Sequence, residues 1–245
     1  MTRRLWIADR VSEGRAWLTG ENAVHLARVL RARNGQHFDI AAEGVTRTGA
    51  IVSISDDLVE FELGPAVAGR RLPEVNVLIS IYKFDRLEWA IEKLTELGVE
   101  RILPVVSRRT EPHLAKAAEK RAERWRRIAR EASQQSRRPA PPEIVEPAAL
   151  AKAMQSVSGS RIVLSELEEQ VSLKAALAEC LAPITLALGP EGGWTPEEAE
   201  EFGKAGWKAA SLGSTILRAE TAAIAAVAVT MAEMSSQHSA VSIQP

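Results

Sequence analysis

Hydrophobic and polar residues follow two different patterns along the chain, and the pattern changes near residue 70. Before this point, short stretches typical of strands surround one stretch with helical spacing, formed by Val24, Leu26, Val29 and Leu30. Thr19 precedes that stretch and is a residue type that caps helices. We expect strands at Arg4–Ala8, Gln36–Ala42, Thr46–Ser53 and Leu58–Leu63. This pattern predicts a small β-rich domain over residues 1–70, followed by a Gly- and Pro-containing linker over 64–74.

From Val75 onward, strands and helices alternate. The apolar runs VNVLISIY, ERILPVV, RIVLSE, PITLALG and WKAASLG predict buried strands. Between the first two runs a helix is expected up to Gly98, a long basic helix is expected over Leu114–Arg137, and the run TAAIAAVAVTMAEM predicts the last helix. The alternation predicts an α/β domain over residues 75–236 with a mostly parallel sheet, and residues 237–245 are expected to form a flexible tail.

Charge is distributed unevenly, although the formal net charge is only −1. The stretch 101–138 holds twelve Lys and Arg against four Glu, whereas the stretch 143–201 holds eleven Glu against three Lys and Arg. The basic stretch therefore suits a phosphate-bearing partner, although a solvated basic helix would show the same composition. Arg126, Arg127, Arg130 and Arg138 are the RNA-binding candidates there, and Arg28 and Arg31 are candidates on the first predicted helix.

Several classes of protein are disfavoured by what the sequence lacks. No apolar run approaches the roughly 20 residues that cross a bilayer, and the N-terminal residues have no signal-peptide core. The single Cys180 excludes an internal disulfide, and His25, His37 and His113 lack the spacing of metal ligands. We therefore expect a cytoplasmic protein without membrane or metal.

A glycine-rich loop, Gly189-Pro190-Glu191-Gly192-Gly193, begins at the last residue of the predicted strand run PITLALG (183–189). Glycines at a strand end allow a ligand to approach the backbone, although a tight turn would also need them. Thr195 and Glu198 form the sequence pattern of a capping box at the start of the next helix. The surrounding glutamates disfavour a phosphate there and favour a neutral or cationic ligand.

A second loop, residues 212–218 (LGSTILR), joins a short strand to the last helix. Its two apolar residues Ile216 and Leu217 are unusual for a connection and predict a loop that packs inside the protein. They could either face a ligand or simply fill the core. Leu164 and Glu166 end another strand, where a carboxylate could accept hydrogen bonds from a ribose.

These loops together resemble the SPOUT superfamily of RNA methyltransferases, and more closely the RsmE-type family of 16S ribosomal RNA uridine N3-methyltransferases. The resemblance covers nearly the whole chain and depends on EKLTELGV (92–99), REASQQSRR (130–138), LALGPEGGWTPEE (186–198) and LGSTILRAETAAIAA (212–226). It implies a PUA-like β-barrel domain, a trefoil-knotted SPOUT domain, a homodimer, S-adenosylmethionine (SAM) as methyl donor, and ribosomal RNA or the small ribosomal subunit as substrate.

The resemblance also implies roles for individual residues. The implied cofactor-binding residues are Leu164, Glu166, Leu188, Gly189, Pro190, Glu191, Gly192, Gly193, Leu212, Gly213, Ile216, Leu217 and Arg218. The implied substrate-side residues are Lys93, Glu96, Arg109, Gln135, Ser136 and Arg138. The chain departs from the family pattern at Thr215 and Gln134, where a basic residue and a glutamate are usual.

Arg218 is the candidate catalytic residue, because a guanidinium could stabilise the anion that forms when uracil loses its N3 proton. The alternative is an ion pair of Arg218 with Glu220 or Glu191 that holds the loop closed. Two other functions remain open: a non-catalytic RNA-binding assembly factor on the same fold, and a methyltransferase acting on another RNA.

Overall fold

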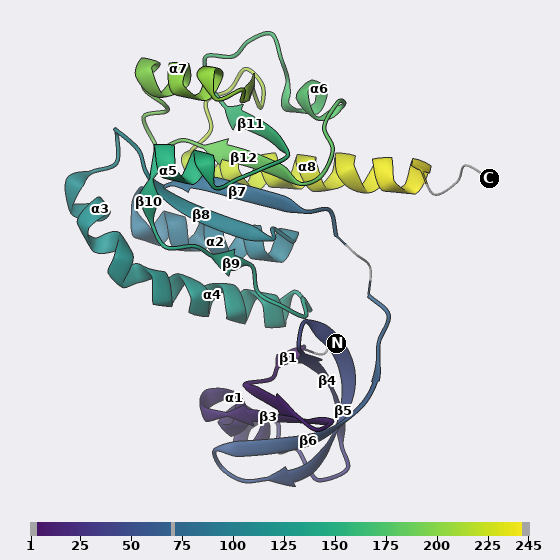
Figure 1. Cartoon of the computed structure of the whole chain (residues 1–245). Coiled ribbons are helices and arrows are strands. Elements are labelled where there is room, and N and C mark those ends of the chain that lie inside the picture. The colour runs from purple at the N-terminus through teal and green to yellow at the C-terminus, as the bar shows by residue number, and fades with distance from the viewer. Residues whose placement is uncertain (1–3, 70–71, 242–245) are drawn as a thin grey trace. The chain divides into compact units, whose positions relative to one another are not determined.

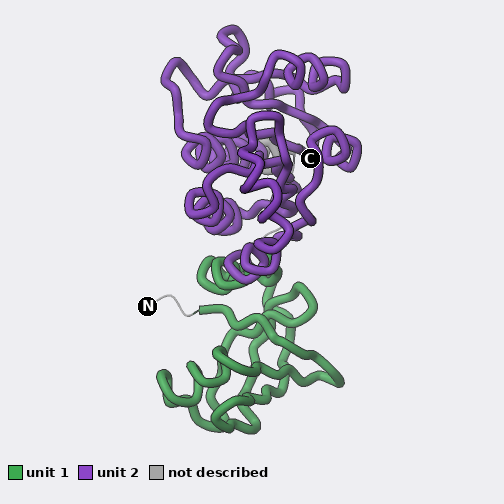
Figure 2. Tube along the Cα trace, turned by 90° about the vertical axis from the view of Figure 1, so that its left-hand side faces the viewer, with its two compact units in different colours: residues 1–71, 130–141 green, residues 72–129, 142–245 purple. Residues whose placement is uncertain are grey.

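The computed structural model describes residues 4–69 and 72–241, with side chains described up to residue 236. The chain divides into two compact units (Figure 2). Unit 1 consists of residues 1–71 and 130–141, and unit 2 consists of residues 72–129 and 142–245. The expected break near residue 70 is therefore present. The grouping of residues 130–141 with the first unit differs from the sequence-based boundaries.

Unit 1 contains a curled six-stranded sheet with the strand order β1-β4-β5-β6-β3-β2 (Figure 1). Neighbouring strands are antiparallel except for β1 and β4, which run parallel. One helical segment follows β3 and covers the sheet. The elements are β1 (Trp6–Ile7), β2 (Arg10–Ser12), β3 (Arg15–Thr19), α1 (Gly20–Val24), the π-helix η1 (His25–Val29), β4 (His37–Ala42), β5 (Val45–Ile54) and β6 (Leu58–Ala66). The β-rich domain is confirmed.

The core of unit 1 lies between this sheet and its helical segment. The buried side chains of this core are Trp6, Ala16, Leu18, Ala23, Leu26, Ile40, Ile51, Val59 and Phe61. Thr19 precedes α1 as expected, but its side chain does not cap the helix. Its backbone N–H and its hydroxyl instead donate to Asp9 Oδ2, over 2.8 and 3.2 Å.

The segment 130–141 is held in unit 1 by polar contacts. The backbone N–H of Leu5 donates to the carbonyl of Gln134 over 3.1 Å. Arg130 donates to the carbonyl of Ile7 over 2.8 Å and to Asp9 Oδ1 over 2.6 Å. Arg137 forms an ion pair with Asp39 at 2.6 Å. These contacts explain why the segment belongs with residues far from it in sequence.

Unit 2 is built on a sheet in which every pair of strands is parallel, with the order β10-β8-β7-β12-β11-β13 and with β9 also paired to β8. This confirms the predicted parallel α/β domain. Its elements are β7 (Val75–Ser80), α2 (Phe84–Leu97), β8 (Arg101–Val106), α3 (Pro112–Ala118), the 3₁₀ turn η2 (Glu119–Arg121), α4 (Ala122–Gln135), β9 (Glu143–Ile144), β10 (Ala148–Ala149), α5 (Leu150–Gln155), β11 (Ser160–Leu164), α6 (Leu173–Leu177), β12 (Ile184–Leu188), α7 (Pro196–Lys204), β13 (Lys208–Ala210) and α8 (Ala219–Val241).

Helices cover both faces of this sheet (Figure 1), so the central strands are buried on both sides. Val77 and Ile79 of β7 pack into a core with residues of α2, α4, α6 and α8. Leu78 points to the opposite face, where α5, α7, Trp194 and Trp207 form the second core. This double burial explains the nearly continuous apolar runs of the strands.

The structure corrects three expected boundaries. The single basic helix expected over Leu114–Arg137 consists of α3, η2 and α4, and β6 extends into the expected linker as far as Ala66. Of the expected tail, residues 237–241 continue α8, and residues 242–245 lie outside the described residues. In the described part of the chain, no helix is both long and apolar enough to span a bilayer.

Candidate cofactor-binding site

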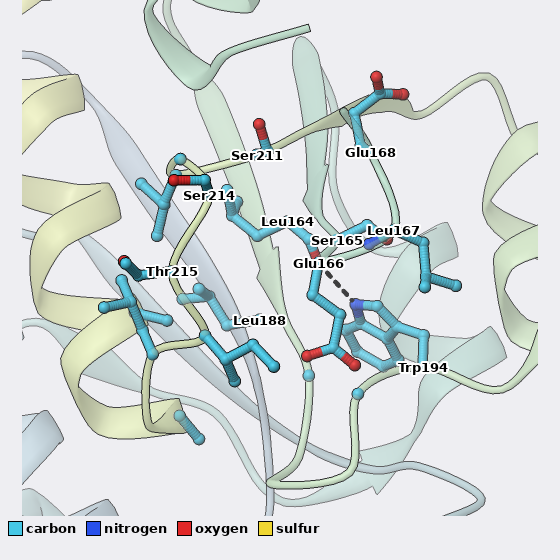
Figure 3. Close-up of a pocket in the computed structure, with 18 of the residues that line it drawn as sticks. Leu164, Ser165, Glu166, Leu167, Glu168, Leu188, Trp194, Ser211, Ser214 and Thr215 are labelled. Carbon is cyan, nitrogen blue, oxygen red and sulfur yellow. Dashed lines mark hydrogen bonds between the residues drawn. The ribbon is translucent and has the colours of Figure 1, made fainter. Parts of the chain in front are cut away.

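The carboxyl ends of β11, β12 and β13 meet because β11 pairs in parallel with both of its neighbours. The loops that follow these strands enclose a cavity of about 670 Å³ (Figure 3). Its lining residues are Leu164, Ser165, Glu166, Leu167, Glu168, Glu169, Gln170, Ser172, Leu188, Gly189, Pro190, Glu191, Gly193, Trp194, Ser211, Leu212, Gly213, Ser214, Thr215, Ile216, Leu217, Ala219 and Ala222. A cavity of this size at the strand ends can accept a nucleoside-sized ligand.

Eleven of the thirteen cofactor-binding candidates line this cavity. Gly192 and Arg218 are not among the lining residues. Sequence reasoning missed the second half of the loop after β11, residues 167–170, and the pocket role of Trp194. It could not foresee them because this loop carries no glycine-rich or apolar signature.

The backbone of the glycine loop closes tightly. The N–H of Gly193 donates to the carbonyl of Pro190 over 2.9 Å. Gly193 adopts φ +69°, a conformation that L-residues other than glycine rarely take. A Cβ atom at this position would lie 2.9 Å from Oε1 of Glu166, whose side chain extends toward the glycine loop (Figure 3). Glycine is therefore favoured at 193 by its backbone conformation, and a Cβ atom there would also displace the flexible carboxylate of Glu166.

Gly192 faces a different neighbour. A Cβ atom there would lie 3.2 Å from Cδ of Arg109, and Arg109 donates to the carbonyl of Gly192. Gly192 therefore contacts Arg109, and its role in binding the cofactor stays a prediction. Arg109 belongs to the predicted substrate-side residues, and this contact places it beside the glycine loop.

Trp194 connects two of the segments that line the cavity. Its indole N–H donates to the carbonyl of Leu164 at the end of β11, over 3.1 Å (Figure 3). Its ring also packs edge-to-face on Phe202, with centroids 4.8 Å apart, and Phe202 packs in the same way on Trp207. The start of α7 is thereby fixed against β11 and the second core.

The predicted capping box at the start of α7 is confirmed. Thr195 Oγ1 accepts from the N–H of Glu198, and Glu198 Oε2 accepts from the N–H of Thr195. The other oxygen of Glu198 accepts from the backbone N–H of Arg108 over 2.7 Å. Both oxygens of this buried carboxylate are thus satisfied, and the loop after β8 is attached to the loop after β12.

The second loop is less buried than the sequence predicts. Ile216 is 85% exposed and lines the cavity, so the expectation that it packs inside the protein is wrong. Leu217 is half-buried and also lines the cavity. Both apolar side chains are available to a ligand, because the loop borders an open cavity rather than the core.

Charge in the cavity is negative. Glu166, Glu168, Glu169 and Glu191 line it, and no Lys or Arg is among its lining residues. Glu168 Oε1 is engaged by the backbone N–H groups of Gln170 and Val171, over 2.7 and 2.9 Å. This arrangement favours a ligand with positive charge.

Arg218 lies at the start of α8 and is exposed. The alternative ion pairs with Glu191 and Glu220 are not formed by Arg218, because both carboxylates face Arg86. Lys93, by contrast, forms ion pairs with Glu92 and Glu96 at 2.7 and 2.8 Å, and these hydrogen bonds raise its pKa.

Several RNA-binding candidates are engaged within the protein. Arg28 pairs with Asp56, Arg126 pairs with Glu123 and Glu146, and Arg130 binds Asp9. Arg31, Arg127 and Gln135 are exposed, and the backbone N–H of Arg138 donates to the carbonyl of Ser133. Because several of these arginines pair with acidic side chains, the number of arginines overstates the positive charge of the surface. Which of these residues bind RNA stays a prediction.

Known proteins resemble this chain in both sequence and fold. A family model described as an RNA methyltransferase domain matches residues 70–231. The ribosomal RNA small subunit methyltransferase E of Bacillus subtilis is 32% identical, with 86% of this chain and 87% of the relative covered. Its namesake from Synechocystis is also 32% identical, with 93% and 77% covered.

Two of the similar solved structures contain SAM. One is a ribosomal RNA small subunit methyltransferase E from Neisseria gonorrhoeae bound to SAM, with a TM-score of 0.83 and 26% identity over 94% of this chain and 98% of that one. The other is a putative methyltransferase from Legionella pneumophila in complex with SAM, with a TM-score of 0.80 and 25% identity, covering 94% and 96%.

The parallel sheet, the cavity at its carboxyl edge and these matches define an RNA methyltransferase. Within this class, the chain belongs to the ribosomal RNA small subunit methyltransferase E family. The predicted family is thereby confirmed, as is the predicted architecture of a β-rich domain in front of a parallel α/β domain.

Replacing Gly193 with Ala is expected to weaken SAM binding by about tenfold or more, because the Cβ atom meets Glu166 and the positive φ becomes strained. Isothermal titration calorimetry on the folded variant measures this loss. Gly203→Ala in α7 is the matched control, since open space surrounds that position. Unchanged SAM affinity in Gly193→Ala would contradict the placement of SAM in this cavity.

Proposed function

We propose that this protein transfers the methyl group of SAM to N3 of a uridine in the 16S ribosomal RNA of the small subunit. The observation that carries the proposal is the acidic cavity at the ends of β11, β12 and β13, in a chain that belongs to the small subunit methyltransferase E family. The choice of uridine N3 depends on the resemblance of the loops at 186–198 and 212–226 to that family.

The cavity suits SAM in three respects. The glycine loop presents backbone without side chains, the apolar side chains Leu188, Ile216 and Leu217 can cover an adenine, and Glu166 can accept hydrogen bonds from a ribose. The carboxylates of the lining favour the positive charge of the sulfonium. When bound there, SAM supplies an activated methyl group, and the residues of the chain orient the two reactants.

Methylation at N3 requires that uracil loses a proton it holds at neutral pH. We propose that Arg218 stabilises the resulting anion by donating to a uracil carbonyl. Two observations support this role: Arg218 directly follows Leu217, which lines the cavity, and its exposed side chain is not held by Glu191 or Glu220. A guanidinium keeps its charge throughout the pH range in which the enzyme works.

The proposed function is tested by mass spectrometry of 16S ribosomal RNA from cells that lack the gene. One N3-methyluridine should be missing, and expression of the intact protein should restore it. An unchanged set of methyl marks in the small subunit, or loss of a mark in another RNA, would contradict the proposal. Restoration by a variant that cannot bind SAM would favour a non-catalytic assembly role.

Arg218→Ala is expected to lower the single-turnover rate of methyl transfer by roughly 100- to 1000-fold, the usual cost of removing one donor to a developing anion. SAM affinity and thermal stability should stay near those of the wild type, since Arg218 neither lines the cavity nor pairs with Glu191 or Glu220. Arg218→Lys, which retains the charge, should recover part of the rate. A wild-type rate of methyl transfer in Arg218→Ala would contradict the proposed catalytic role of Arg218.

We also propose that the protein is a homodimer that pairs through α8. This helix packs on α2 and α6, yet a strip along it remains only partly buried and consists of Ala222, Ile224, Ala225, Ala228 and Val229. A second copy could cover such an apolar strip. Light scattering should give about twice the chain mass of 26.6 kDa, whereas a stable monomer at micromolar concentration would contradict the dimer.

A further inference from the structure

Arg86 connects three segments that are distant in the sequence. It lies in the first turn of α2, and its Nη1 atom is 2.7 Å from Oε1 of Glu191 in the glycine loop. Its Nε atom is 3.9 Å from Oε1 of Glu220 in the first turn of α8. Glu191 and the first turn of α8 belong to two different segments of the cavity wall, since Glu191, Ala219 and Ala222 all line it. One guanidinium therefore bridges the two segments from outside the cavity.

The carboxylate of Glu220 depends on this bridge. The residue is only 5% exposed, and its Oε2 atom has no hydrogen-bond partner among the described residues. Arg86 is also the only cation of the described residues within 4 Å of either Glu220 or Glu191. Without Arg86, this buried carboxylate would have no cationic side chain nearby, and only the N-terminal end of the α8 dipole would favour its charge.

Tyr82 lies next to this group, just before α2, and is itself buried. Its hydroxyl has no hydrogen-bond partner among the described residues. Burial, followed by the charges of Glu220 and Glu191, raises the pKa of the phenol well above its ordinary value, so Tyr82 stays neutral. Within this cluster, Arg86 is the one side chain that forms ion pairs with both Glu191 and Glu220 among the described residues.

We propose that Arg86 is a positioning residue for SAM, which sets the separation between the glycine loop and the loop that leads into α8. The inference rests on the proposed placement of SAM in this cavity. Arg86 does not line the cavity, so it acts through Glu191 and Glu220 rather than by touching the cofactor.

The link to Glu191 is suited to positioning rather than to stabilising the fold. The side chains of Arg86 and Glu191 are 32% and 39% exposed. Ion pairs of this exposure contribute little to the free energy of unfolding, because water screens them. They can still restrict a loop, and a small displacement of a cavity wall changes ligand affinity strongly.

The test compares Arg86→Ala, Glu191→Ala and the double variant, with SAM affinity measured by calorimetry and thermal midpoints measured in parallel. Arg86→Ala is expected to raise the Kd for SAM about tenfold, within the usual range for coupling between sites. The KM for SAM should rise similarly, while kcat at saturating SAM should stay within about twofold of the wild type. Arg86→Lys should recover part of the affinity.

The double variant identifies the route of the effect. Because part of the effect of Arg86 passes through Glu191, the double variant should lose less affinity for SAM than the sum of the losses in the two single variants. Fully additive losses would overturn the proposal, since they would mean that none of the effect of Arg86 passes through Glu191. Arg101→Ala is the matched control: Arg101 pairs with Glu143 at 2.7 Å with an exposure of 30%, and its loss should leave SAM affinity unchanged.

A further variant distinguishes the proposed positioning role of Arg86 from a purely structural role. If Arg86→Ala does not fold, adding Glu220→Gln removes the buried charge and should restore the thermal midpoint. The proposal predicts that SAM affinity remains weak in that folded variant. Recovery of SAM affinity together with stability, or a folded Arg86→Ala variant with a Kd within about twofold of the wild type, would overturn it. Failure of the wild-type protein to bind SAM would instead contradict the proposed function.

Discussion

The parallel pairing of β11 with both β12 and β13 is the constraint on which the site depends. Parallel strands end on the same edge of a sheet, so the three loops that follow them converge although they lie up to about 50 residues apart in the chain. One further contact joins two of these loops, because Trp194 donates to the carbonyl of Leu164. A second contact attaches the loop after β12 to the loop after β8, because Glu198 accepts from the backbone N–H of Arg108. The sheet thus brings the cavity loops together, and these polar contacts hold them.

Much of the fold could be predicted from the sequence, because buried strands and helices have regular patterns of apolar residues. Strands buried on both faces gave continuous apolar runs, and the capping box of α7 gave Thr195 and Glu198 at the right spacing. The β2–β3 hairpin was missed because its strands are short and its outer face is exposed. Its turn is Glu13-Gly14, with φ +49° and +74°, and Glu43-Gly44 forms a similar turn between β4 and β5. A Glu-Gly pair in such a turn is a weaker signal than the Asn-Gly or Asp-Gly that hairpins prefer.

The parts of the candidate site that consist of glycines and of apolar residues in loops could be predicted from the sequence. Eleven of the predicted cofactor residues line the cavity, yet the partners of charged side chains could not be read from the sequence. The sequence offered an ion pair of Arg218 with Glu220 or Glu191 as an alternative, whereas Arg86, more than 100 residues away from both carboxylates, contacts them. Ion pairs join residues by position in space, and the packing of α2 against α8 brings Arg86 close to Glu220.

The composition of unit 1 has a consequence for how this architecture can be modified. The unit contains two separate stretches of chain, 1–71 and 130–141, and the second stretch supplies Arg130 to Asp9, Arg137 to Asp39 and the carbonyl of Gln134 to Leu5. A gene segment that encodes only the first stretch would omit these groups and leave Asp9 and Asp39 without their cations. Unit 1 therefore cannot be transferred as one continuous segment: grafting it onto another protein requires two insertions, and recombination at a single junction would leave it incomplete.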